Sequence, residues 1–95
     1  MQKRVVKPGR PIGTTTFKPA AAAAFGSVVR ERRKERGLSQ EELAHRAGVE
    51  RSHMGKIERG EHLPNLVMIL RIADVLSLKP GKLVDMSVEA MRQEG

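Results

Sequence analysis

The chain has 95 residues, with no cysteine, tryptophan or tyrosine and only two phenylalanines. Without cysteine, disulfides and thiolate zinc sites are excluded, which fits a reducing compartment. No apolar run approaches the roughly 20 residues that would cross a bilayer. The basic N-terminus also has no apolar segment of the kind a signal peptide carries. We therefore expect a cytoplasmic protein that has no membrane partner.

Patterns typical of an enzyme or a metal site are also missing from the sequence. The three histidines form neither an HExxH motif nor another compact ligand pattern. Asp74 and Asp85 are isolated carboxylates, which suits a helix surface better than acid–base catalysis. There is no glycine loop for phosphate, and Ser39 is better explained as a helix cap than as a nucleophile. We expect no enzyme activity, no metal and no cofactor.

The positive charge of the chain is concentrated in its first third. Residues 1–36 carry ten Lys and Arg against two acids, a net +8, whereas residues 37–95 carry eight against nine, a net −1. Such an asymmetry favours a polyanionic partner, above all a nucleic acid. The alternative is a basic tail that only keeps the protein in solution.

Residues 1–19 are expected to form a flexible basic arm. This segment contains three prolines and the run Thr14–Thr16, and its few apolar residues follow no helical or strand period. It cannot bury enough apolar surface to offset its ordering entropy. Its candidate DNA-binding cations are Lys3, Arg4, Lys7 and Arg10.

The rest of the chain predicts helices only, with a domain over residues 20–86 and a C-terminal helix end over 87–95. A first helix is expected over 20–36, because alanines favour helix and Phe25, Val28 and Val29 follow helical spacing. Gly37 is expected to end it. Ser39, followed three residues later by Glu42, forms a capping box for a second helix that stops at Gly48.

Three further helices follow. The third helix is expected to begin near Arg51 and to end at Gly60. Glu50 either caps it or interacts favourably, as an acid, with the positive end of the helix dipole. The fourth, capped by Asn65, is apolar nearly all round, which suits a core or an interface. Its inward face is predicted to hold Leu66, Ile69, Leu70, Ala73 and Leu76. The fifth begins at Pro80, and its stripe of Met86, Val88 and Met91 is interpreted as a dimerisation element; the alternative is a tail packed on its own subunit.

Two short helices that meet at a glycine turn make up residues 38–60. Ala44 provides a small side chain where the two helices would cross. Val49 and Ile57 are apolar at positions where the second helix must pack against the rest of the domain. This is the pattern of a helix-turn-helix, which presents its second helix to the major groove of DNA.

The segment from Gly37 to Val84 resembles the Cro/CI (XRE-type) helix-turn-helix family. The motifs that match, in order and spacing, are Leu38–Ala44, Ala47–Val49, Ile57–Gly60, Pro64 and Ile72–Leu76. The resemblance implies an all-α, five-helix, lambda-repressor-like domain that binds double-stranded DNA, here with the flexible basic arm in front of it.

The same resemblance implies roles for individual residues. Gln40 would contact phosphate and brace the recognition helix. Arg51, Ser52 and Lys56 would reach base edges, and 52 and 56 lie one helical turn apart, which supports a shared exposed face. His53 and Arg59 are candidate phosphate contacts. The resemblance also implies a partly buried salt bridge between Arg33 and Glu58. The alternative for the whole set is an ordinary solvated helix face.

Two local features modify this expectation. The loop Glu61–Leu63 carries an acid where some relatives carry basic phosphate contacts, which weakens the contribution expected of the loop. In the arm, Gly9–Pro11 resembles the core tripeptide of AT-hook peptides, which insert an arginine into the A·T minor groove. Plain phosphate attraction, or an ordinary turn, explains that tripeptide as well.

We therefore predict a nucleoid-associated transcriptional regulator, a repressor that binds a palindromic operator as a homodimer. Contact with RNA polymerase at the promoter is a further possible partnership. Close alternatives are a controller protein of a restriction–modification system and an antitoxin that represses its own operon. From other classes, a protein-interaction module without DNA binding and a nonspecific architectural protein acting through the arm remain open.

Overall fold

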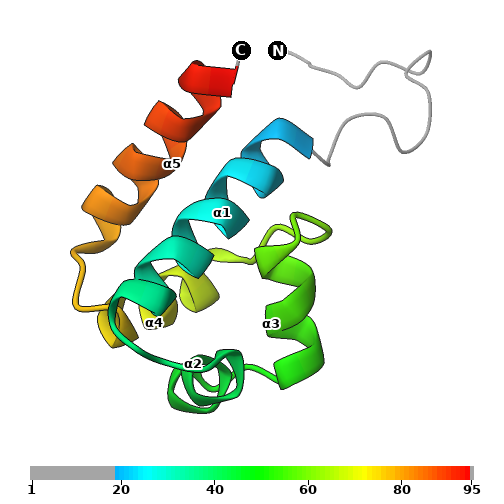
Figure 1. The fold of residues 1–95 in the computed structure, drawn as a ribbon, viewed down its shortest axis with the longest axis vertical. Coiled ribbons are helices and arrows are strands. Elements are labelled where there is room, and N and C mark those ends of the chain that lie inside the picture. The colour runs from blue at the N-terminus through cyan, green and yellow to red at the C-terminus, as the bar shows by residue number, and fades with distance from the viewer. Residues whose placement is uncertain (1–18, 95) are drawn as a thin grey trace, which may run out of the picture.

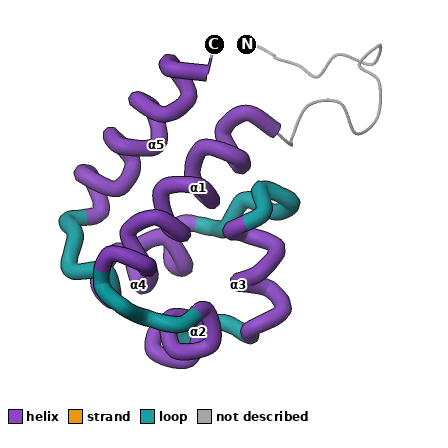
Figure 2. The backbone as a smooth tube through the Cα atoms, in the orientation of Figure 1, coloured by secondary structure: helices purple, strands orange, loops and turns teal. Residues whose placement is uncertain are grey.

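The computed structural model describes residues 19–94, which form five helices and no strand (Figures 1 and 2). The helices are α1 Pro19–Glu35, α2 Gln40–Ala47, α3 Arg51–Glu58, α4 Leu66–Val75 and α5 Pro80–Glu94. The all-α, five-helix fold expected from the sequence is confirmed, and each helix begins within about a residue of its predicted start. Residues 1–18 and Gly95 lie outside the described part.

Side-chain caps start two of the helices where the sequence predicts them. The Ser39 hydroxyl accepts a hydrogen bond from the Glu42 backbone N–H at 2.9 Å, and the Asn65 side chain accepts one from Met68 N–H at the same distance. Glu50 occupies the N-cap position of α3 without a side-chain hydrogen bond. Its contribution there is therefore the favourable charge at the positive end of the helix.

The turn between α2 and α3 depends on Gly48. Its backbone is left-handed, with φ of 72°, and its N–H donates to the carbonyl of His45 at 3.2 Å. The next N–H, that of Val49, donates to Ala44 at 2.9 Å. A side chain at this position would be strained, so glycine allows the chain to leave α2 and enter α3 within a few residues.

The core lies where the five helices meet, with α1 packed against α5 on one side and against α3 on the other (Figure 1). Every helix contributes to it. The largest fully buried side chains are Val29, Leu43, Met54, Ile57, Ile72 and Leu83. The short α2 and α3 are thus held in place by packing rather than by their own helix propensity, which is marginal at eight residues.

The orientation of α4 differs in part from the prediction. Leu66 and Leu70, expected to face inward, are 67 % and 44 % exposed, whereas Ile72 is fully buried. A helix that is apolar nearly all round does not specify which side faces the core. Packing against α2 and α5 turns the Ile72 and Ala73 side inward and leaves Leu66, Val67 and Leu70 at the surface.

Helix α5 continues without a break through residue 86 to Glu94. Leu83 is buried and Met86 packs half-buried against the core, while Val84 and Val88 are exposed. Part of the apolar stripe therefore packs on its own subunit, and part remains at the surface. Within residues 19–94, no helix is both long and apolar enough to cross a membrane.

Candidate nucleic-acid interface

The outer face of α3 presents the residues that the sequence selected for base contacts. Arg51, Ser52 and Lys56 are all exposed. Together with Gln40 and Arg59 they line one open hollow of about 330 Å³. The hollow brings the N-terminus of α2 beside the length of α3, which is the surface a helix-turn-helix presents to DNA.

A buried network of hydrogen bonds and one ion pair lies beneath that surface and holds it in place. Arg33 of α1 forms a bidentate ion pair with Glu58 of α3, with Nε to Oε2 at 2.7 Å and Nη2 to Oε1 at 3.0 Å. A third guanidinium N–H donates to the Leu38 carbonyl at 2.9 Å, and the amide of Gln40 donates to Glu58 Oε1 at 3.1 Å. The hydrogen bonds from Arg33 to Glu58 raise the pKa of Arg33, so the guanidinium stays charged. The network joins α1, the start of α2 and the end of α3.

Gly26, which the sequence reasoning missed, sets the distance between α1 and α3. A Cβ at this position would overlap the carbonyl oxygen of Ile57 and lie 2.8 Å from that of Glu58. The two backbones therefore touch directly beside the Arg33–Glu58 pair. A glycine in the middle of an alanine-rich helix lowers its helix propensity. Such an unfavourable residue could have indicated that another part of the backbone approaches the helix closely there.

Arg59, a predicted phosphate contact, forms an ion pair with Glu61 of the loop that follows α3. Its guanidinium donates to both carboxylate oxygens of Glu61, at 2.9 and 3.2 Å, and both side chains are exposed. The hydrogen bond between them raises the pKa of Arg59 and lowers that of Glu61. Glu61 therefore occupies the guanidinium that the sequence predicts to contact phosphate, in addition to bringing negative charge to the loop.

His53 is less exposed than the other predicted contacts of α3, and it lines a separate hollow together with Ser52 and Lys56. It is half-buried, and its ring packs edge-on against the ring of His62, with centroids 4.4 Å apart. Its Nε2 atom is buried and has no hydrogen-bond partner. Across the described ranges, the side chains of His, Asp and Glu form no group of three or more suited to a metal ion.

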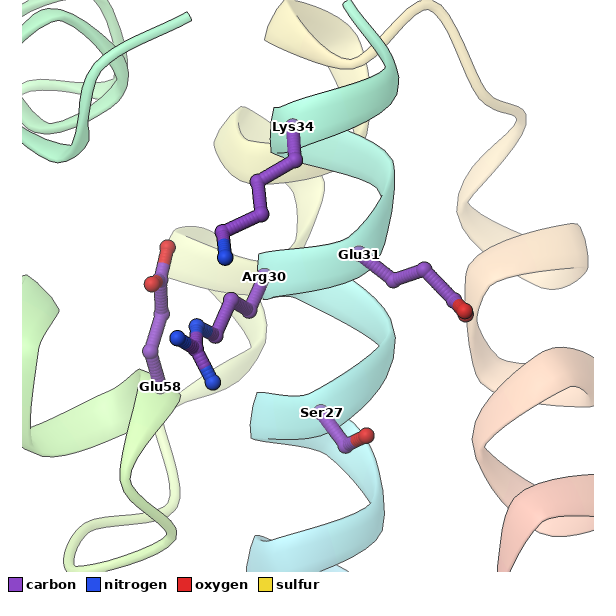
Figure 3. Close-up of a pocket in the computed structure, with 5 residues that line it drawn as sticks. All are labelled: Ser27, Arg30, Glu31, Lys34 and Glu58. Carbon is purple, nitrogen blue, oxygen red and sulfur yellow. The ribbon is translucent and has the colours of Figure 1, made fainter.

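A second open hollow, of about 340 Å³, lies on the α1 side of Glu58. Its lining includes Ser27, Arg30 and Lys34, and Figure 3 shows the two cations directed toward α3. The sequence reasoning did not select Arg30 or Lys34, because only the apolar residues of the first helix follow a recognisable pattern. The predicted cations of the arm, Lys3, Arg4, Lys7 and Arg10, lie outside the described residues.

A family profile described as "Helix-turn-helix domain" matches residues 24–85, which span α1 to the start of α5. The chain belongs to the Cro/CI-type helix-turn-helix family. Membership places it among DNA-binding transcriptional regulators, and the resemblance found in the sequence is confirmed.

Individual relatives agree with the family assignment. An HTH-type transcriptional regulator of Methanothermobacter thermautotrophicus is 48 % identical over 50 residues, which cover 53 % of this chain and 72 % of the relative. The restriction–modification controller protein C.AhdI of Aeromonas hydrophila is 44 % identical, with a TM-score of 0.65 over 67 % of this chain and 97 % of that one. The clp gene regulator ClgR of Corynebacterium glutamicum, 19 % identical, shares the fold with a TM-score of 0.74 over 78 % of this chain and 79 % of its own.

Proposed function

We propose that this regulator is a repressor that binds a two-fold operator as a homodimer, with α3 of each protomer in the major groove. Arg51 would bind a guanine edge through two hydrogen bonds, a contact worth about 1–3 kcal/mol of discrimination. Ser52 and Lys56 would read neighbouring positions. Gln40 at the start of α2 would contact the phosphate beside them.

The observation that carries this proposal is a set of exposed polar side chains on α3, a helix whose orientation is held by the Arg33–Glu58 ion pair. Arg51, Ser52 and Lys56 are exposed, while Glu58 at the other end of α3 is fastened to Arg33 and Gln40. A base-reading site needs such support, because a shift of about an ångström breaks bidentate geometry. A surface that served only solubility would need no buried ion pair behind it.

The dimer is supported by apolar side chains that the protomer leaves at its surface. Leu63, Val84 and Val88 are 37 %, 44 % and 38 % exposed and line one groove. Leu66, Val67 and Leu70 of α4 are further apolar side chains that the protomer leaves exposed. Exposed apolar patches of this kind mark association sites. A two-fold dimer would bind half-sites about 10 bp apart, and bound protein would block polymerase.

We extend the proposal to the organisation of the chain. Residues 20–86 would act as the DNA-reading unit, and the basic arm of residues 1–19 would add phosphate or minor-groove contacts. The protein would then reside with the chromosomal DNA that it regulates. Contact with RNA polymerase is a separate possibility, which would make the protein an activator.

Selection from a random duplex DNA pool at near-physiological salt tests the base-reading step. The wild type is compared with Arg51→Ala/Lys56→Ala and with a matched control, Lys79→Ala/Lys82→Ala, which removes the same charge. Lys79 and Lys82 are exposed at the start of α5, a helix that packs on α1 and α4. We expect the wild type and the control to enrich the same palindromic motif, and the α3 variant to enrich none.

Other results would select other functions. Weak binding without any motif, lost when residues 1–18 are removed, would indicate a nonspecific architectural protein that acts through its arm. No DNA binding by the wild type would make the chain a protein-interaction module on a helix-turn-helix fold.

The likeness to C.AhdI favours one second candidate, a controller protein of a restriction–modification system. Such a protein would use the same α3 surface on an operator beside its own gene. The enriched motif decides between the two: a controller requires that its operator precede restriction or methyltransferase genes. An operator elsewhere would leave the general repressor, and an adjacent toxin gene would indicate an autorepressing antitoxin.

A further inference from the structure

The interface on α3 continues onto α1 through the buried Glu58. Glu58 lines the hollow of α1 that holds Arg30 and Lys34. Gln40, which donates to Glu58 at 3.1 Å, lines the hollow of α3 that holds Arg51 and Lys56. The hydrogen bond between Gln40 and Glu58 therefore links the two hollows.

We propose that Arg30 and Lys34 of α1 form a second phosphate-binding site, which holds the DNA backbone beside the groove entered by α3. This inference rests on the proposed DNA binding and adds an element that the base-reading set does not contain. The ligand is a phosphodiester of duplex DNA, and the contact would position the protein without reading sequence.

The geometry of the two side chains suits this role. They lie four residues apart on α1, about 6 Å along the helix axis, so they extend over the same face. Figure 3 shows both directed toward α3, while Glu31 of the same turn is directed toward α5. Both residues are exposed, and none of the ion pairs within residues 19–94 includes either of them.

The acid at the floor of the hollow does not oppose an anion. The Glu58 side chain is only 2 % exposed, and its two oxygens already accept hydrogen bonds from Arg33 and Gln40. Its charge is thus balanced by the Arg33 guanidinium. Glu31 also lines the hollow, although its side chain is directed toward α5. Two cations, Arg30 and Lys34, against this one acid leave the open volume of about 340 Å³ with a net positive charge.

A purely structural role for Arg30 gives a different expectation. The carbonyl ends of α3 at Ile57 and Glu58 lie against Gly26, one helical turn before Arg30. A cation near a helix C-terminus stabilises it through the helix dipole. In that case, loss of Arg30 would lower the melting temperature and leave the salt dependence of DNA binding unchanged.

The test compares Arg30→Gln/Lys34→Gln with the wild type and with Lys79→Gln/Lys82→Gln, which loses the same charge on the α5 side. Affinity for the selected operator and for unrelated duplex DNA is measured against salt concentration. We expect the α1 variant to bind both DNAs roughly tenfold or more weakly, with a salt slope lower by about 1.8 per protomer. The selected motif and the melting temperature should stay unchanged.

Each other result has a distinct meaning. A wild type that binds no DNA overturns the proposed function and this inference together. Operator binding by the α1 variant with the wild-type salt slope overturns this inference alone. Should the double variant unfold, Lys34→Gln alone carries the test, with a slope lower by about 0.9 per protomer. The charge-preserving variant Arg30→Lys/Lys34→Arg should retain the wild-type slope, and a loss of slope there would contradict the proposal.

Discussion

Arg33 and Glu58 lie 25 residues apart in the chain, yet their side chains form a bidentate pair with distances of 2.7 and 3.0 Å in the interior of the domain. The pair holds the C-terminal end of α3 against α1 and gives Gln40 an acceptor at the edge of the proposed DNA-binding surface. The buried charge pair thus adds to core packing in positioning the proposed recognition surface.

Removing one partner of that pair should strongly destabilise the fold. In Glu58→Ala the Arg33 guanidinium, 11 % exposed, would stay buried without its counter-charge. We expect the free energy of unfolding, measured by urea denaturation, to fall by about 3–5 kcal/mol. The control Glu35→Ala removes an exposed pair with Arg32 and should change it by less than about 1 kcal/mol. A loss no greater than that of the control would show that the pair does not support the fold.

Replacing both residues of the ion pair distinguishes its effect on the stability of the fold from its effect on DNA binding. Arg33→Met/Glu58→Leu buries apolar groups where the ions were, a change that is often neutral or stabilising. Gln40 would then lose its acceptor. We expect a stability close to that of the wild type together with weaker operator binding in a fluorescence anisotropy titration. Unchanged affinity would mean that Gln40 needs no support from Glu58.

The close contact of α1 with α3 predicts opposite effects for two glycine-to-alanine changes. Gly26→Ala places a methyl group against the carbonyls of Ile57 and Glu58. Such overpacking should cost about 1–3 kcal/mol or more. Gly81→Ala in the first turn of α5 has no heavy atom within 4 Å of the new methyl group and should stabilise by roughly 0.4–1 kcal/mol. Thermal unfolding measures both, and a neutral Gly26→Ala would disprove the close approach.

The local features of this fold were predictable because they depend on neighbours in sequence. Ser39 and Asn65 cap their helices through residues three positions later, and Gly48 turns the chain with its own backbone. The orientation of α4 was not predictable in the same way. Leu66, Leu70 and Ile72 are all strongly apolar, and only packing against the other helices decides which of them is buried.

For the candidate site, sequence selected the residues of α3 but not the groups around them. Arg30 belongs to the first helix, and nothing in the local sequence shows that its side chain is directed toward α3. Arg59 and Glu61 lie two residues apart, but only the turn that follows α3 brings their side chains together. The sequence identified Glu61 as an unfavourable charge, and the structure adds that it engages Arg59 directly.

The ion pair between Arg59 and Glu61 predicts tighter DNA binding when Glu61 loses its charge. In Glu61→Gln the guanidinium of Arg59 becomes free to bind a phosphate. We expect stronger binding and a salt slope steeper by about 0.9 per protomer, measured with operator and with unrelated DNA. The control Arg59→Gln/Glu61→Gln should lose this gain. Equal slopes for Glu61→Gln and the wild type would show that Arg59 contacts no phosphate.

The pH dependence of this gain follows from the direction of the pKa shift. The hydrogen bond from Arg59 lowers the pKa of Glu61, so the carboxylate keeps its charge throughout the neutral range. The pair is fully formed above the ordinary pKa of a carboxyl group and is lost only as the pH falls through the lowered value. The difference between Glu61→Gln and the wild type should therefore stay constant from neutral to mildly acidic pH. A difference that vanished on mild acidification would contradict the shift.

The exposed valines of α5 predict a variant that loses the dimer and keeps the fold. Val84 and Val88 lie one turn apart and are 44 % and 38 % exposed, so Val84→Lys/Val88→Lys should leave the core packed around Leu83. Lysines buried between two protomers would oppose association. We expect a monomer by analytical ultracentrifugation, with helix content unchanged by circular dichroism and operator binding strongly weakened. The control Gln93→Lys, at an exposed position of the same helix, should remain dimeric. A dimeric Val84→Lys/Val88→Lys protein would place the interface elsewhere, with the exposed Leu66 and Val67 of α4 next to be tested.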